Sequence, residues 1–364
     1  MKFIDEYRDP QLGQKILDRI RRHSTKPARF MEFCGGHTTA IFRHGIRQLL
    51  PDTIEMLSGP GCPVCVTANR DLDKAMAFAG LPNVIIASFG DMLRVPGSYS
   101  SLQQAKAEGQ DIRVVYSTDD ALNIARHNPD KAVIFIGIGF ETTAPTVASS
   151  ILQAEAEGIN NYYILPLHKL CPPIMKAILD LGEVRIGGII GPGHVSAIIG
   201  SYPYHFIPRD YGIACVVSGF EPLDILLAVD MLVDQIETGQ RKVEIAYRRG
   251  VKPEGNSSAL GLINTVFEVC DTDWRGIGVV PASGLKLGRR YQRFDAESNF
   301  HIDPGPTLEA KGCICGRILR GVSTPLECQL FHNSCTPEHP VGPCMVSAEG
   351  SCAAYYQYGD SNGG

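Results

Sequence analysis

The sequence lacks the features that would place the protein on nucleic acid or in a membrane. Its 34 lysines and arginines are outnumbered by 39 aspartates and glutamates, so no positive excess attracts a polyanion. No uncharged apolar run approaches the roughly 20 residues that a membrane-spanning helix requires. The N-terminal segment, MKFIDEYRDP, carries charges of both signs and lacks the apolar stretch of a secretion signal. We therefore expect a cytoplasmic protein without nucleic-acid or membrane partners.

A P-loop and a dense disulfide framework are also missing. No Gly-x4-Gly-Lys-Ser/Thr sequence is present, so a P-loop ATPase is not expected. Twelve cysteines among 364 residues are too few for a disulfide scaffold, and a reducing compartment would keep them as thiols. Metal binding or redox chemistry is therefore the use that we expect for these thiols.

The residues that are present predict two or three compact units. With 364 residues, 44% of them hydrophobic, the chain exceeds the size that one core usually fills. Between residues 28 and 217, short apolar strands alternate with amphipathic helices, which indicates parallel sheets covered on both faces. We expect an α/β protein with two tandem parallel-sheet domains, 1–118 and 119–250, and a C-terminal cysteine-rich domain, 251–364.

The strand candidates are Arg29–Phe33, Thr53–Leu57, Asn83–Phe89, Ile112–Tyr116, Ala132–Ile138, Tyr162–Leu165, Gly188–Ile190 and Ile213–Val217. The helix candidates are Thr39–Leu50, Asn69–Phe78, Asp119–His127, Leu223–Ile236 and Ser257–Val269.

Two cysteine motifs follow the first two strand candidates. Cys34-Gly-Gly-His37 follows one, and Cys62-Pro-Val-Cys65 follows the other after a Gly-Pro-Gly turn. Backbone N–H groups of such a turn can face the thiolates and make them reactive. If the two strands are neighbours, three thiols and one imidazole converge beyond the carboxyl ends of the sheet, where open parallel sheets bind their ligands.

This convergence has four interpretations. A structural zinc site would use the three cysteines and the histidine. A thioredoxin-like redox pair would use Cys62 and Cys65 alone. A transient site would hold a soft, low-valent metal ion on the thiolates. The fourth alternative is that the cysteines are buried and bind no ligand.

Glu141 is a candidate acid or base, because it follows a strand candidate in the sequence Gly-Phe-Glu-Thr-Thr-Ala-Pro. Pro145 suits the first turn of a helix that would begin after this strand. The alternative for Glu141 is a structural carboxylate that the helix dipole favours in that first turn. His168 and His194 also follow strand candidates and have the same two interpretations, functional or structural.

The last 52 residues contain six of the twelve cysteines. They are Cys313, Cys315, Cys328, Cys335, Cys344 and Cys352. Thiols so concentrated in a cytosolic chain indicate a metal centre, either zinc or an iron–sulfur cluster. Paired C-x2-C spacing, which is typical of zinc ribbons, is absent from this segment. The wide spacings therefore favour a [4Fe–4S] cluster held by four separate loops.

Several motifs spanning nearly the whole chain resemble those of the HypD family of hydrogenase maturation factors. They are Cys34-Gly-Gly-His37-Thr38, Gly59-Pro-Gly-Cys62-Pro-Val-Cys65, Gly139-Phe-Glu141-Thr-Thr-Ala-Pro145, Pro166-Leu-His168-Lys169, Gly191-Pro-Gly-His194-Val-Ser and the six-cysteine tail. The motifs occur in the order of the family. Such agreement over independent motifs is far more specific than a single C-x-x-C pair.

The resemblance implies a scaffold on which the Fe(CN)2(CO) group of nickel–iron hydrogenases is assembled. It implies a complex with the small chaperone HypC and a transient encounter with HypE, which donates cyanide. The Fe(II) that carries CN and CO would be held by Cys34, Cys62 and Cys65, with a HypC thiolate sharing it. His37 and Glu141 would be nearby polar groups of this assembly site.

For the C-terminal domain, the resemblance implies a [4Fe–4S] cluster on Cys313, Cys328, Cys335 and Cys352, in preference to Cys315 and Cys344. The cluster would supply electrons, either to a Cys62–Cys65 disulfide or for attaching the diatomic ligands. The expected function is therefore a scaffold with redox activity. An iron–sulfur thiol–disulfide oxidoreductase and a zinc-stabilised interaction module are the alternatives.

Overall fold

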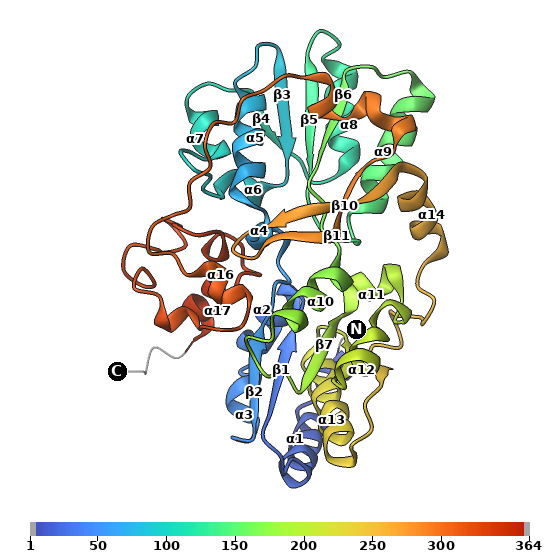
Figure 1. The fold of residues 1–364 in the computed structure, drawn as a ribbon, viewed down its shortest axis with the longest axis vertical. Helices are drawn as coiled ribbons and strands as arrows, with labels where there is room; N and C mark the ends of the chain where they lie inside the picture. The colour runs from blue at the N-terminus through green and yellow to red at the C-terminus, as the bar shows by residue number, and fades with distance from the viewer. Residues whose placement is uncertain (1–4, 360–364) are drawn as a thin grey trace.

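The structure, a computed structural model, describes residues 5–359 (Figure 1). Residues 1–4, which begin the N-terminal segment considered above, and residues 360–364 lie outside this range. In Figure 1 the molecule is elongated, with one parallel sheet in its upper half and another in its lower half. The hairpin of β10 (Phe267–Trp274) and β11 (Gly278–Leu287) crosses between them, and the cysteine-rich segment lies to the left.

Two parallel sheets carry the strands that the sequence predicts. The lower sheet has the order β2-β1-β7-β8-β9, and the upper sheet has the order β4-β3-β5-β6. The strands are β1 (Ala28–Glu32), β2 (Ile54–Ser58), β3 (Val84–Ser88), β4 (Ile112–Val114), β5 (Ala132–Gly137), β6 (Tyr162–Pro166), β7 (Gly188–Pro192), β8 (Ala214–Ser218) and β9 (Val243–Ile245). All eight strand candidates are confirmed, within one or two residues at most ends.

The order of the strands differs from the tandem arrangement that we expected. Strands β1 and β2 pair with β7, β8 and β9, which lie more than a hundred residues later, and the segment between them forms the upper sheet. The expected boundary at residue 118 therefore falls inside the upper sheet, between β4 and β5. Local hydrophobic patterns identify strands but not their partners, so they could not reveal this interleaving.

The helices cover the sheets and break where the local sequence requires it. They include α1 (Pro10–His23), α2 (Gly35–Arg43), α3 (Ile46–Leu49), α4 (Pro63–Val66), α5 (Asn69–Ala79), α8 (Thr118–His127), α9 (Ala144–Glu157), α10 (Cys171–Leu181), α11 (Gly193–Ile199), α13 (Pro222–Thr238) and α14 (Ser257–Val266). The predicted helix Thr39–Leu50 is divided because Gly45 adopts a left-handed conformation with φ +60°. The predicted helix Ser257–Val269 ends at Val266, where β10 begins.

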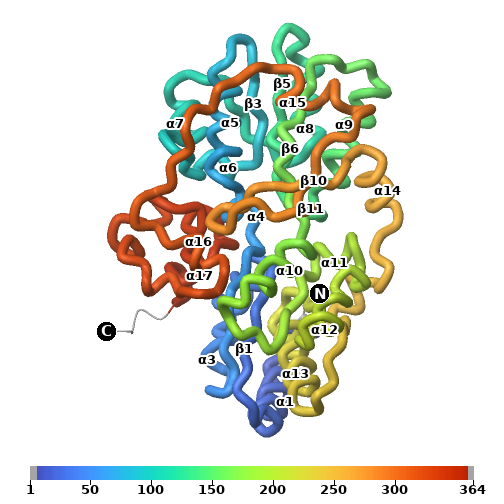
Figure 2. The backbone as a smooth tube through the Cα atoms, in the orientation of Figure 1, coloured from blue at the N-terminus to red at the C-terminus, as the bar shows by residue number. Residues whose placement is uncertain are grey.

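The hairpin and the cysteine-rich segment join the two halves of the molecule (Figures 1 and 2). At its tip, Trp274 bridges to Thr67, and farther along β11, Gly284 bridges to Lys169. The cysteine-rich segment contains α16 (Cys315–Leu319) and α17 (Ser351–Tyr358). Helix α17 packs against α2, and the rings of Tyr355 and Phe42 lie 4.4 Å apart.

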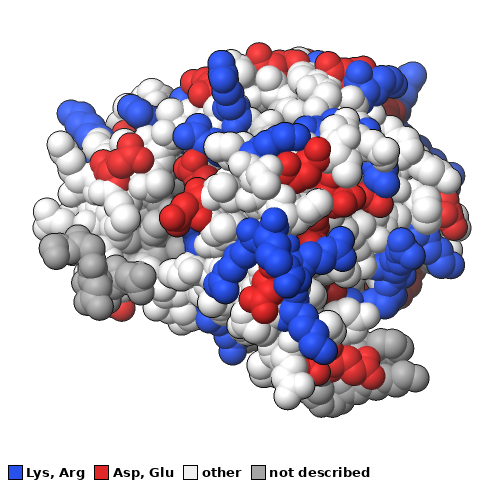
Figure 3. Space-filling model, turned by 90° about the horizontal axis from the view of Figure 1, so that it is seen from below, with Lys and Arg blue, Asp and Glu red and all other residues white. Residues whose placement is uncertain are grey.

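The distribution of charge on the surface and the hydropathy of the helices are in line with the composition of the sequence. Both charge signs are interspersed over the face seen from below (Figure 3). None of the helices within residues 5–359 combines the length and the apolar character that crossing a membrane would require.

Candidate functional site

The two N-terminal cysteine motifs lie side by side because their strands are neighbours. Strands β1 and β2 pair in parallel, with Glu32 opposite Ser58, so the loops that follow them leave the same edge of the sheet. The N–H group of Gly35 donates a hydrogen bond of 3.1 Å to the carbonyl oxygen of Gly61. A Cβ atom on Gly61 would lie 2.2 Å from the backbone nitrogen of Cys34. The motifs therefore meet backbone to backbone, as the sequence predicts for neighbouring strands.

The Cys62–Cys65 pair forms a tight turn at the start of α4. Cys62 is the N-cap residue, and its sulfur accepts the backbone N–H of Cys65 at 3.3 Å. The donor is the N–H of Cys65 itself, whereas the N–H of Gly61 in the preceding turn donates to the carbonyl oxygen of Gly59. Burial raises the pKa of the Cys62 thiol well above its ordinary value. Although burial also acts on Cys65, hydrogen bonds from Cys344 and Cys62 and the charge of Arg275 lower the pKa of the Cys65 thiol.

Cys65 also connects the first cysteine group with the second. The neighbouring thiols of Cys315, Cys352 and Cys65 raise the pKa of the Cys344 thiol well above its ordinary value, so all three lie close to it. The Cys65 sulfur also lies 3.8 Å from the carbonyl oxygen of Pro343. The two groups are some 250 residues apart in the sequence, and Cys65 and Cys344 are the cysteines at which they lie next to each other.

Two carboxyl groups lie next to Cys34. The backbone N–H of Cys34 donates a hydrogen bond of 2.8 Å to Glu32, whose buried side chain also accepts the hydroxyl of Thr38. Glu349 comes from the cysteine-rich segment and packs against Gly35. Burial, followed by the charges of Glu349 and Glu32, raises the pKa of the Cys34 thiol to about 12. Burial raises the pKa of Glu32 to about 7.

His37 is held as a neutral imidazole with one free acceptor. Its Nε2 atom lies 2.9 Å from the carbonyl oxygen of Gly219 and 3.3 Å from that of Ser218, so Nε2 carries the proton. Burial lowers the pKa of His37 to about 4. Its Nδ1 atom is buried and has no hydrogen-bond partner among the described residues. The ring stacks on Phe220 at a centroid distance of 4.7 Å.

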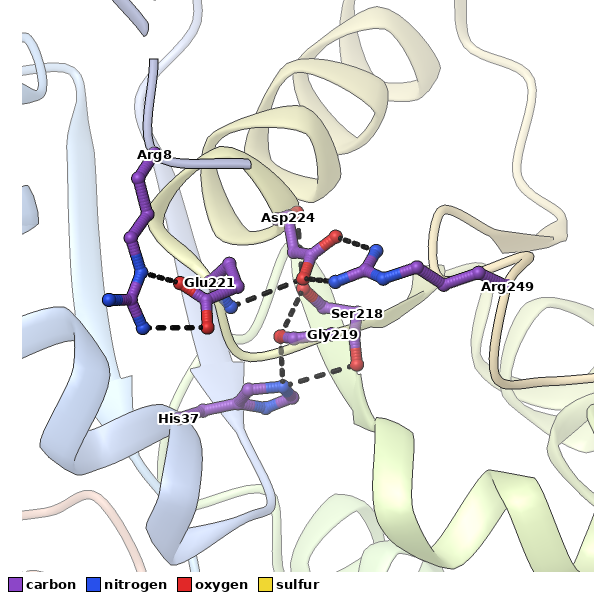
Figure 4. Close-up of polar contacts among 7 residues, drawn as sticks. All are labelled: Arg8, His37, Ser218, Gly219, Glu221, Asp224 and Arg249. Atoms are coloured by element: carbon purple, nitrogen blue, oxygen red, sulfur yellow. Dashed lines mark hydrogen bonds and ion pairs between the residues drawn. The ribbon is translucent and has the colours of Figure 1, made fainter. Parts of the chain in front are cut away.

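The turn that holds His37 is fixed by two ion pairs (Figure 4). Arg249 donates two hydrogen bonds of 2.6 Å to the buried carboxylate of Asp224. The same carboxylate accepts the backbone N–H of Glu221 at 3.1 Å, and the side chain of Glu221 pairs with Arg8. These contacts anchor the turn after β8 and thereby orient the imidazole.

Glu141 approaches the site from the upper sheet. Its Oε1 atom accepts the backbone N–H of Cys171 at 2.9 Å, and its Oε2 atom is buried without a partner in the described part of the chain. Burial raises the pKa of Glu141 to about 7. Pro145 lies in the first turn of α9, as predicted, but Glu141 precedes this helix and instead bonds to the first residue of α10. The charges of Glu141 and Cys34 both act on Cys171, so the two sheets meet there.

The six C-terminal cysteines face one narrow pocket. They line it together with the apolar side chains of Ile318, Leu330, Phe331 and Met345. All twelve cysteines are free thiols, and Cys335 accepts the backbone N–H of Val341 at 3.3 Å. Clustered thiols in an apolar shell are the donor type that an iron–sulfur cluster uses, although no three of them within residues 5–359 are spaced to hold one metal ion.

Some expected contacts are absent from the structure. Within residues 5–359, no three His, Cys, Asp or Glu side chains are arranged so that they could hold a metal ion. His168 is buried, and neither of its ring nitrogens has a hydrogen-bond partner among residues 5–359. Its neighbour Lys169 is buried against the hairpin, where it donates to Thr272 and Asp273. The ring of His194 stacks on that of Phe220 at a centroid distance of 3.8 Å.

Three residues beside the thiols, Glu32, Glu349 and Arg275, are not among the site residues that the sequence predicts. Glu32 is an acidic residue at the end of an apolar strand, directly before a cysteine motif, and this position is a signal that could have identified it. Glu349 and Arg275 reach the thiols from segments more than 200 residues away in the sequence, so no local pattern points to them.

Comparisons with known proteins extend over nearly the whole chain. A family model described as HypD, hydrogenase formation hypA family, matches residues 11–359. The hydrogenase maturation factor HypD of Cupriavidus necator is 46% identical over 99% of this chain and 97% of its own. The HypD of Escherichia coli is 45% identical over 98% of both chains. The hydrogenase expression/formation protein HupD of Azotobacter chroococcum is 47% identical over 99% of this chain and 97% of its own. The chain therefore belongs to the HypD family of hydrogenase maturation factors.

Proposed function

We propose that this protein is the scaffold on which an Fe(CN)2(CO) group is built during hydrogenase maturation. Cys34, Cys62 and Cys65 would hold the iron substrate, a HypC thiolate would share it, and HypE would donate cyanide. The observation that carries the proposal is the backbone contact between Gly35 and Gly61, which brings the two cysteine motifs together. The names of the curated relatives, which are hydrogenase maturation factors, support the same role.

The chemistry of the thiols suits a metal that must later leave. Polarizable thiolates match a low-valent iron with strong-field ligands. Cys34 is partly exposed whereas Cys62 and Cys65 are buried, so a partner's thiolate can reach an ion bound at Cys34. In the described part of the chain, His37 Nδ1 and Glu141 Oε2 are buried without a partner, so one can accept a hydrogen bond and the other can carry a proton.

We further propose that Cys313, Cys328, Cys335 and Cys352 bind a [4Fe–4S] cluster. A bound cluster would supply electrons at this position. Cys315 and Cys344 then remain as a dithiol, and Cys344 touches Cys65. This contact supports a path from the C-terminal cysteines to the Cys62–Cys65 pair.

The closeness of Cys344 to Cys65 and Cys315 permits a thiol–disulfide exchange between the two cysteine pairs. The Cys344 thiolate attacks the Cys65 sulfur of a Cys62–Cys65 disulfide, and the Cys62 thiolate leaves. The Cys315 thiolate then attacks Cys344, and the Cys65 thiolate leaves. Two electrons pass to the Cys62–Cys65 pair, which takes up two protons, while Cys315 and Cys344 become a disulfide.

Infrared and Mössbauer spectra of the anaerobically purified complex with HypC and HypE test the scaffold role. We expect cyanide and carbonyl bands in the unsubstituted chain, and their loss in Cys34→Ala, Cys62→Ala and Cys65→Ala with the cluster iron retained. Cys270→Ala, which changes a half-buried cysteine on β10, is the matched control and should keep the bands. Bands that survive in all three site variants would contradict the proposal.

The contact between Cys65 and Cys344 also favours a second candidate, an iron–sulfur thiol–disulfide oxidoreductase. This candidate predicts reduction of a protein disulfide without any diatomic infrared bands. Metal analysis that finds zinc and no iron would instead favour an interaction module.

A further inference from the structure

A second pocket, of about 390 Å³, lies beside the cysteine-rich segment. Its walls come from the hairpin tip, from residues 308–310 and from α16. The volume lies in the range of pockets for small molecules and is much larger than a single ion needs. Cys313 and Cys315 form part of one wall. The pocket therefore adjoins the cysteine site, but none of the roles proposed above uses it.

The walls of this pocket are positively charged. Three arginines line it, Arg275, Arg317 and Arg320, against a single acidic residue, Glu309. Arg320 is neutralised by Glu183 at 2.6 Å. Neither Arg275 nor Arg317 forms an ion pair with any residue in the described range 5–359. Neither group has a carboxylate within ion-pair distance in the described range, although Arg275 acts on the Cys65 thiol, and Arg317 donates its Nε–H to Ser323 at 3.1 Å and acts on Glu327.

Of the three arginines, Arg275 gives the strongest evidence for a bound anion. Its side chain is buried, with the residue only 5% exposed, and one of its terminal nitrogens donates to the carbonyl oxygen of Pro96 at 3.3 Å. Its Nε atom is buried and has no partner in the described part of the chain. A buried guanidinium with an unsatisfied donor is costly unless an anion binds it. The backbone of Arg275, which donates to Val66 at 3.0 Å, holds the side chain in this place.

We propose that this pocket binds a small molecule through a carboxylate or phosphate group, with Arg275 and Arg317 as its anion-binding residues. The planar fork of an arginine donates two parallel hydrogen bonds to the oxygens of either group. Both residues line the pocket, Arg317 as an exposed side chain and Arg275 as a buried one. The rest of the volume accommodates the body of the ligand.

Isothermal titration calorimetry of the full chain with inorganic phosphate and, separately, with succinate tests the proposal and distinguishes the two anion classes. We expect one of the two to bind, and Arg317→Gln to weaken its binding about tenfold, which is the loss of one charge-assisted hydrogen bond. Arg275→Met should abolish binding. If Arg275→Met does not fold, Arg317→Gln alone decides the test, because its side chain is exposed.

Arg22→Gln is the matched control, since it removes the same charge from an exposed position of α1. It should leave binding unchanged. Hydrogen exchange should also slow in residues 308–317 when the bound probe is present. Binding of neither probe, equal weakening by Arg22→Gln, or unchanged binding in Arg317→Gln would each overturn the proposal.

Discussion

At the scale of single residues, the closeness of the two cysteine motifs depends on a residue without a side chain. Gly61 lies directly on the backbone of Cys34, and there is no space between them for another atom. From the sequence, a glycine before a C-x-x-C pair is expected only to form a turn. Gly61 also contacts the end of a neighbouring strand, and this second role cannot be predicted without knowing which strands pair.

Gly61→Ala should destabilise the protein by about 1–3 kcal/mol, because its Cβ would lie 2.2 Å from the Cys34 nitrogen. Gly261→Ala is the matched control: the same atom is added inside α14, where nothing lies within 4 Å. It should stabilise the protein by about 0.5–1 kcal/mol through helix propensity. Urea denaturation under reducing conditions measures both, and equal effects of the two substitutions would show that the motifs do not touch at Gly61.

Glu141→Gln should reduce the dependence of stability on pH. Burial raises the pKa of Glu141 from 4.5 to about 7, so the folded chain holds this proton more tightly than the unfolded chain. The stabilisation is complete below about pH 4.5 and is lost as the pH rises through about 7. This residue alone accounts for a fall of up to about 3 kcal/mol in the free energy of unfolding.

Urea denaturation between pH 5 and 8 checks this expectation. The fall should be smaller in Glu141→Gln than in the unsubstituted chain. Glu32, with a pKa of about 7, contributes a fall of the same sign in both proteins, and His37, with a pKa of about 4, contributes an opposite rise below about pH 6.5 in both. Glu254→Gln, at an exposed loop position, should not alter the slope. An identical slope in all three proteins would mean that Glu141 is not buried as a carboxylic acid.

At the scale of elements, the tip of the β10–β11 hairpin joins the Cys62–Cys65 turn to α16. Arg275 donates its backbone N–H to Val66, and the backbone of Gly276 lies against that of Gly316. The strand candidates were found because each is an apolar run between turn signals. The hairpin was not, because its strands alternate buried and exposed residues irregularly and β10 follows a helix without a break.

Gly276→Ala should loosen the contact between the hairpin and α16. The added Cβ would lie 2.2 Å from the Cα atom of Gly316, and Gly276 has a φ of +69°. Gly278→Ala is the matched control in the same turn, because Gly278 has a φ of +95° but nothing within 4 Å. Both substitutions strain the backbone, by about 1–2 kcal/mol.

Hydrogen exchange of residues 313–320 distinguishes the two substitutions. It should rise several-fold in Gly276→Ala and stay near that of the unsubstituted chain in Gly278→Ala. If both variants exchange alike, the hairpin tip does not hold α16.

At the scale of the whole molecule, the interleaved sheets bring distant segments to one place. Neighbouring strands put Cys34 beside Cys62, and this part of the site could be predicted because successive strands often pair. The approach of Cys344, Glu349 and Arg275 to these thiols could not be predicted, because it depends on how the cysteine-rich segment and the hairpin pack on the sheets. The tandem arrangement was wrong for the same reason: β7 returns to β1 instead of extending a second sheet.

The connection between the two cysteine groups is most directly measured by disulfide trapping. In the double variant Cys62→Ser/Cys315→Ser, made in a Cys352→Ser background because Cys352 also neighbours Cys344, the cysteines that could resolve a bond between Cys65 and Cys344 are gone. Mild oxidation followed by peptide mass spectrometry without reduction should therefore yield the Cys65–Cys344 cross-linked peptide, and adding Cys344→Ser should remove it. If Cys65 and Cys344 both remain free thiols in the folded double variant, or if Cys65 pairs with another cysteine, the two groups do not form one site.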